Sequence, residues 1–140
     1  MLKGEVGRIC FSRLLKDEEL TESIKRRVEE SGIKAGVFFL IGSLQNVTLG
    51  YYDGDKYQTV QINGPLEIAS CTGNIAVDEE GKTVVHAHLI VSNSKCEAFG
   101  GHLLQKSKVG ATAELVIVEA IGVNLKRAFD EETKLKLLNL

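Results

Sequence analysis

Only one stretch of this chain has the apolar spacing of a surface helix, and the other apolar residues fall in short runs separated by turn residues. In the helical stretch, Leu20, Ile24 and Val28 repeat every fourth residue and therefore lie on one helical face. The short runs are typical of strands. Because parallel strands need long crossover connections, usually helical, a single helix among many runs favours antiparallel pairing. The sequence therefore predicts an α+β fold with a mainly antiparallel β-sheet and one long helix.

The predicted helix has signals at both ends. Asp17 is the expected N-cap, and Glu18 and Glu19 follow it at the positive end of the helix dipole. Gly32 is the expected stop, because glycine readily takes the left-handed conformation that ends many helices. The Lys-Arg-Arg run at 25–27 lies late in the helix among acidic neighbours, which indicates a solvated helix face rather than a nucleic-acid surface.

Turn residues divide the rest of the chain into six or seven expected strands. Gly42-Ser43 is expected to end one strand, Asp53-Gly54 to form a hairpin turn, and 63–65 to form a further turn. Gly73 interrupts a strand, which indicates a bulge or the close approach of another segment. The tail at 130–140 is compatible with a short strand or a helical turn. The expected strands are 9–14, 35–41, 44–52, 56–62, 66–77, 82–91 and 111–120.

Length and composition predict a single domain over residues 1–140. The chain is 44% hydrophobic and 26% charged, which is enough apolar material to bury one core. Its net charge of −2 argues against binding of nucleic acid through many phosphate contacts. The three cysteines are an odd number without CxxC spacing, and no run has the length of a signal peptide or a bilayer span. A cytoplasmic protein with no membrane contact is therefore expected.

The residues most able to carry chemistry are the three histidines. His86 and His88 are two apart in an expected strand, so their side chains point the same way, roughly 6.5–7 Å apart along the backbone. His102 follows Gly100-Gly101, a glycine pair that permits a tight backbone approach to that strand. Three imidazoles suit zinc, and also iron, nickel or copper, and leave a coordination position open. A half-exposed sheet face also tolerates histidine without a metal, so the spacing alone leaves both interpretations open.

Other polar residues are weaker candidates. Glu67 and Glu114 lie in apolar strand contexts, where a buried carboxylate needs a partner, and Arg13 is a candidate for that partner. Near a metal, Glu67 and Arg13 are also the candidates for hydrogen-bonding to the ligands and orienting them, and Glu67 is alternatively a candidate general base. A structural ion pair or a solvent-facing carboxylate is the alternative. Cys96, between the histidines, is expected in a loop and is a poor candidate ligand.

Several short motifs follow one another along the chain. They are Gly42-Ser43-Leu44, Glu67-Ile68-Ala69-Ser70, Gly73-Asn74-Ile75, His86-Ala87-His88, Gly100-Gly101-His102-Leu103, Thr112-Ala113-Glu114 and Arg127-Ala128-Phe129-Asp130. In this order they resemble a known family, the PPC (plants and prokaryotes conserved) domain in its free-standing bacterial and archaeal form. The resemblance spans nearly the whole chain, from about Arg13 onward, and Gly-Gly-His-Leu together with His-x-His is its most specific part.

This resemblance implies a homotrimer of antiparallel sheets flanked by helix. It also implies a metal-binding set at His86, His88 and His102, with zinc or another divalent transition metal as the cofactor. A DNA-associated regulator is the second hypothesis, because plant members follow AT-hook motifs that bind the minor groove; this chain has no Arg-Gly-Arg-Pro core and no basic extension. The third hypothesis is an assembly module in which Phe38, Phe39 and the strand at 115–118 bury faces between subunits. The sequence names no small-molecule ligand and no reaction.

Overall fold

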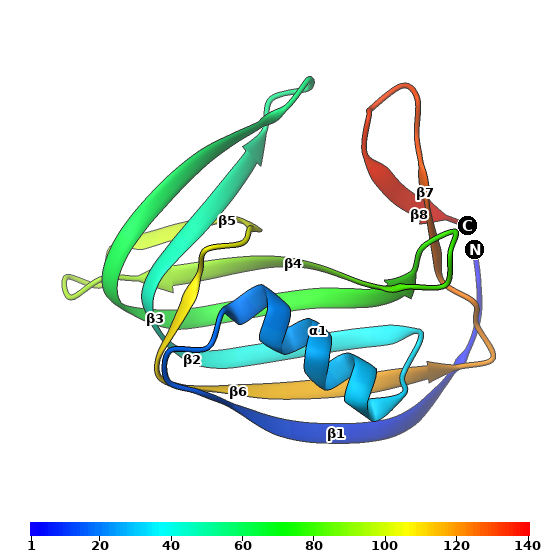
Figure 1. Ribbon diagram of the computed structural model, residues 1–140, viewed down its shortest axis with the longest axis horizontal. Coiled ribbons are helices and arrows are strands. Elements are labelled where there is room, and N and C mark those ends of the chain that lie inside the picture. Colours follow the sequence, from blue (N-terminus) through cyan, green and yellow to red (C-terminus); the bar gives the residue numbers. More distant parts are fainter.

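The computed structural model describes residues 1–140 as one helix and eight strands in one sheet (Figure 1). The sheet order is β1-β6-β2-β5-β4-β3-β7-β8, with β2 also paired to β3, and only the contact of β3 with β7 is parallel. The predicted mainly antiparallel α+β fold with one helix is therefore confirmed. The elements are β1 (Glu5–Leu15), α1 (Leu20–Ser31), β2 (Gly36–Tyr52), β3 (Tyr57–Val77), β4 (Thr83–Ser92), β5 (Ala98–Leu103), β6 (Lys108–Ile121), β7 (Lys126–Phe129) and β8 (Lys136–Asn139).

The helix begins two residues after the position that the sequence suggests. Glu19, not Asp17, is the N-cap, and its carboxylate accepts the backbone N–H of Glu22 at 2.8 Å. Asp17 instead lies in the preceding turn with a φ of 72°. A right-handed helix requires a negative φ, so Asp17 is not part of α1. Gly32 ends α1 in the left-handed conformation, as predicted. At twelve residues, this helix is too short to cross a bilayer.

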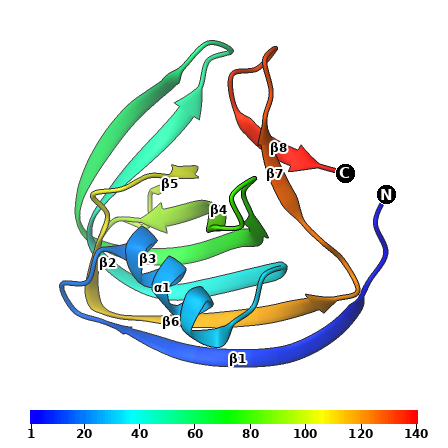
Figure 2. The same ribbon diagram turned by 45° about the vertical axis from the view of Figure 1, so that its right-hand side comes forward.

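The apolar face of α1 packs onto one face of the sheet. Leu20, Ile24 and Val28 are fully buried, and the helix contacts β1, β4 and β6. Figures 1 and 2 show it lying across the hollow of the curved sheet. Alternate residues of the strands complete this core. They include Phe38, Leu40, Leu44, Ile75, Leu89, Leu115 and Ile117.

Two turns expected from the sequence are absent. Gly42-Ser43 and the segment at 63–65 lie inside β2 and β3, which form one long hairpin. The pairing shifts register between Leu40 and Gly42, and again between Leu44 and Asn46, so β-bulges absorb the irregular residues without ending the strands. The Asp53-Gly54 turn is confirmed and joins the ends of these two strands.

The second half of the chain contains three strands outside the seven expected ones: β5, β7 and β8. Residues 98–103, where no strand is expected, form β5 between β4 and the far end of β2. The tail forms β8, which pairs with β7. Figures 1 and 2 show the β2–β3 and β7–β8 hairpins projecting beyond β4. The Tyr52 hydroxyl donates to the carbonyl of Thr133 at 2.6 Å and ties the two hairpins together.

The face of the sheet opposite α1 is open. Along β2, Phe38 and Leu40 are buried beneath the helix, whereas Phe39 and Ile41 are exposed on the other side. Phe38 is therefore a core residue and not the interface candidate suggested by the sequence. Along β4, Ala87 and the other odd-numbered residues face the core, and the even-numbered residues, His86 and His88 among them, face the open side.

Gly73 supplies a stability prediction for this packing. A Cβ atom at Gly73 would lie 2.3 Å from Cζ of Phe38 and 2.5 Å from the carbonyl oxygen of His86, which confirms the predicted close approach. Gly73→Ala is expected to lower the free energy of unfolding by about 1–3 kcal/mol, because the core cannot admit the methyl group without a shift. Urea denaturation measures the change. Gly100→Ala is the control, since its nearest neighbour would be the flexible side chain of Ile90 at 3.3 Å, which has to yield by only a few tenths of an ångström; an equal loss in both variants contradicts the explanation.

Candidate metal centre

Strand register brings the three histidines together on the open face. His88 on β4 is directly opposite His102 on β5, and Thr72 on β3 is opposite His88 on its other side. Side chains directly opposite in an antiparallel pair have Cβ atoms about 4.5–5.5 Å apart. His86 lies two residues from His88 on the same face. The predicted approach of His102 to the other two is therefore observed, although a paired strand and not a loop delivers it.

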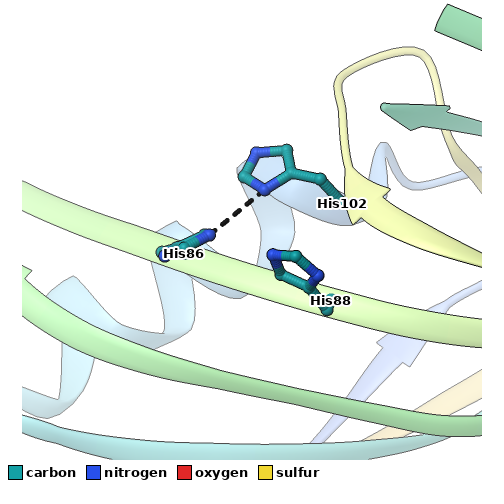
Figure 3. Close-up of side chains that lie close together, drawn as sticks. All are labelled: His86, His88 and His102. Carbon is teal, nitrogen blue, oxygen red and sulfur yellow. Dashed lines mark hydrogen bonds between the residues drawn. The ribbon is translucent and has the colours of Figure 1, made fainter. Parts of the chain in front are cut away.

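The rings form a compact cluster (Figure 3). Nε2 of His86 lies 3.1 Å from Nδ1 of His102, and one nitrogen from each ring lies within 4.8 Å of the others. The ring centroids are 4.8–5.2 Å apart. His88 is exposed and makes no hydrogen bond, whereas the other two rings are half-buried.

Arg127 fixes the proton positions in this cluster. Its Nη2 lies 2.8 Å from Nδ1 of His86. A guanidinium can only donate, so Nδ1 of His86 accepts and the proton of the neutral ring is on Nε2. That Nε2–H then donates to Nδ1 of His102, which leaves the His102 proton on its Nε2. A donor chain from Arg127 through His86 to His102 results in the metal-free site. Because a metal needs the lone pair of Nε2, binding an ion there would move the His86 proton to Nδ1 and break the hydrogen bond from Arg127.

Two of the three rings, those of His86 and His102, are held in the uncharged form. Burial, followed by the nearby Arg127 charge, lowers the pKa of His86 to about 4. Burial, followed by His88 and Arg127, lowers the pKa of His102 to about 4 as well. Both rings are therefore neutral near pH 7, which is the form that ligates metals.

The donor set is compatible with a divalent transition metal. In a tetrahedral site, two nitrogens that each lie about 2.0–2.1 Å from the ion are about 3.4 Å apart. The 3.1 Å between His86 and His102 is already close to this separation, whereas the 4.8 Å spread of the whole set has to close by about 1.4 Å. The exposed ring of His88, which makes no hydrogen bond, is the one free to move. No carboxylate or cysteine joins the cluster, so three protein ligands would leave a position open.

Arg127 is a site residue that the motifs did not single out for a role. It is only 6% exposed, and its Nη1 donates to the carbonyl of Lys136 at 2.8 Å. Its Nη2 also donates to Oδ1 of Asn74 at 2.9 Å, while Nε has no partner. No carboxylate forms an ion pair with this guanidinium, and leaving a buried charge unpaired costs on the order of 3–5 kcal/mol. Only a pairing of distant segments, β7 with β8 and β3, brings Arg127 to the histidines.

The other predicted site residues lie elsewhere. Glu67 is exposed and opposite Ser92, at the other end of β4 from His86, and has no contact with the cluster. Arg13 is opposite Glu114 on the edge pair β1–β6, and these two side chains share a surface hollow but form no ion pair. Cys96 is exposed in the turn before β5, as expected for a loop residue.

Comparison with known proteins shows the family and the fold of this chain. Residues 1–121 match the family model of the Plants and Prokaryotes Conserved (PCC) domain. A crystal structure of a metal-containing protein from Archaeoglobus fulgidus is 32% identical, with a TM-score of 0.89 over 100% of this chain and 99% of that one. A plant- and prokaryote-conserved (PPC) protein from Pyrococcus horikoshii is 29% identical, with a TM-score of 0.90 over 100% and 98% of the two chains.

A curated relative is much longer than this chain. The bifunctional protein GlmU of a Synechococcus strain is 29% identical over 127 residues, which cover 90% of this chain but only 19% of GlmU. This chain therefore spans about a fifth of the length of that relative.

The depressed histidine pKa values predict how stability varies with pH. Unfolding returns His86 and His102 to their ordinary pKa near 6.5, so below that pH the unfolded chain binds protons that the folded chain does not. The free energy of unfolding of the metal-free protein is therefore expected to fall as pH decreases from 6.5 toward 4. Urea denaturation at pH 7, 6 and 5 measures the slope. His86→Gln should flatten it, and an unchanged slope in that variant contradicts the assignment.

Proposed function

This chain belongs to the Plants and Prokaryotes Conserved domain family, and from that membership and its site geometry we propose that it is a metal-binding protein. The ligands are His86, His88 and His102. One observation carries the proposal: the chain has three histidines, and the fold gathers a nitrogen of each within 4.8 Å of the others on an open face. The description of the Archaeoglobus fulgidus relative as metal-containing supports it.

Zinc is the ion we propose, because neutral imidazoles in a set of three suit it well. When bound, such an ion supplies Lewis-acid chemistry at its open coordination position. The surrounding residues position the rings: in the metal-free site Arg127 holds the ring of His86, and Tyr57 lies against the ring of His102 with centroids 4.8 Å apart. The ring of His88 is the exposed one of the three.

We also propose that the protein is a homotrimer. The open face carries a band of apolar side chains beside the histidines, with Phe11 79%, Phe39 48% and Ile41 57% exposed. Phe11 and Phe39 are both opposite Val116 of β6, one on each side of that strand. A second copy of the chain would remove this band from water, and burial of apolar area is the main driving force of such assembly.

A DNA-binding function is the weaker alternative. A structure from Ralstonia eutropha with 27% identity and a TM-score of 0.81 is provisionally described as DNA-binding. In this chain two of the three cations of the helix are already paired: Arg26 with Glu18, and Arg27 with Glu18 and Glu30. With a net charge of −2, the chain has no excess of cations for phosphate contacts.

Metal titration tests the centre. Zinc added to chelator-treated protein is expected to bind once per chain, and His86→Ala or His102→Ala is expected to weaken binding at least tenfold, since each removes one ligand. Isothermal titration calorimetry and elemental analysis measure both quantities. Cys96→Ser is the matched control and should bind as wild type does. No zinc uptake by the folded wild-type protein would refute the proposal.

Sedimentation equilibrium tests the assembly. The wild-type particle is expected at three times the 15.3 kDa chain mass. Phe39→Glu places a charge in the centre of the apolar band and is expected to give monomers. Val60→Glu, at an equally exposed position on the β2–β3 hairpin, should leave the trimer intact. A wild-type monomer, or a trimer that tolerates Phe39→Glu, would contradict the assignment of this band.

A further inference from the structure

A buried cation beside the histidines lacks a partner of opposite charge. Arg127 is only 6% exposed, and its acceptors are two uncharged oxygens and one uncharged ring nitrogen. Its Nε is buried and has no hydrogen-bond partner at all. Buried charges in proteins are ordinarily paired, and each unsatisfied buried polar atom calls for an explanation. The fold therefore holds a guanidinium ready for an anion that the chain itself does not provide.

Arg127 lines a pocket that a small molecule can enter. The pocket has a volume of about 240 Å³ and lies between β4 and the β7–β8 hairpin, with Tyr57 of β3 at its edge. His86, His102 and Lys136 also line it, and no aspartate or glutamate does. The hydrogen bond from Tyr52 to Thr133 holds the β2–β3 hairpin against the loop between β7 and β8, above these residues. The polar lining of the pocket is thus made of donors and cations.

We propose that this pocket binds a small oxyanion, the carboxylate or phosphate group of a small molecule, and that Arg127 supplies the charge that recognises it. The inference deepens the proposed function by naming a ligand class for the pocket beside the histidines. It does not require the metal, because the guanidinium, the pocket and the missing counter-charge are all features of the chain itself.

The guanidinium has the donors that this role requires. It carries five N–H groups, and three of them are used by Lys136, Asn74 and His86, which leaves two without acceptors. Hydrogen bonds between a guanidinium and a carboxylate or phosphate are about twice as strong as neutral ones. The same contacts to Asn74 and Lys136 hold the side chain in place before a ligand arrives, which reduces the entropy lost on binding. Lys136 adds a second positive charge at the pocket wall.

Anion titration of chelator-treated protein tests the proposal. Orthophosphate and acetate, each at constant ionic strength, are titrated into the folded protein by calorimetry. Wild type is expected to bind at least one of them once per chain, and the stronger ligand shows whether phosphate or carboxylate is the natural class. Arg127→Gln is expected to weaken binding at least tenfold, and Arg127→Lys to weaken it less, because it keeps the charge but loses the planar donor set. Arg8→Gln removes an exposed arginine that pairs with Glu119 and should change nothing.

A second measurement covers the case in which Arg127→Gln does not fold. In wild-type protein the Nε–H resonance of Arg127 is expected to shift on addition of the bound anion, while that of Arg8 stays in place. Binding of neither anion, an unmoved Arg127 resonance, or wild-type affinity in Arg127→Gln would overturn the proposal. Because the metal is absent from these titrations, failure of zinc binding and failure of anion binding are recorded separately.

Discussion

The register between β4 and β5 is the constraint on which the site depends. It sets His102 directly opposite His88, and it also places His102 next to Gly50 at the end of β2. A shift of one residue would turn the ring of His102 to the other face of the sheet. β5 is short, but it pairs with β2 on one side and β4 on the other, and Leu103 packs into the core. The packing of one leucine thus determines where the neighbouring imidazole points.

Because side chains alternate along each strand, the two faces of the sheet carry different residues and have different roles. One face buries its apolar residues beneath α1 and makes the stable core. The other carries, in one row across neighbouring strands, Phe39, Thr72, His88 and His102. The apolar part of that row suits contact with another copy of the chain, whereas the histidine part suits a metal and a small ligand. Gly73 allows close packing on the core side of the sheet. Because it has no side chain, the ring of Phe38 and the backbone of His86 can both approach it.

Arg127 connects the electrostatics of the site to the end of the chain. It comes from β7, is held by Asn74 of β3 and by the backbone of β8, and donates to His86. Its charge contributes, after burial, to keeping His86 neutral. One buried cation therefore holds a candidate metal ligand in the metal-free site, contributes to keeping it unprotonated near neutral pH, and has no counter-charge from the chain. The C-terminal hairpin is part of the site, although it lies outside the span of residues that match the family model.

The sequence by itself determined the features that depend on near neighbours in the chain. The four-residue spacing of Leu20, Ile24 and Val28 specified the buried face of the helix, and the two-residue spacing of His86 and His88 specified that both rings share a face. Tertiary structure decided what depends on distant segments. β2 continues past Gly42 with bulges because strands on both sides form backbone hydrogen bonds with it. The pairing of β5 with β4 positions His102, and the pairing of β7 with β8 positions Arg127. Local spacing fixes the direction of a side chain along its own strand, but only the register of the neighbouring strand decides which residue it meets.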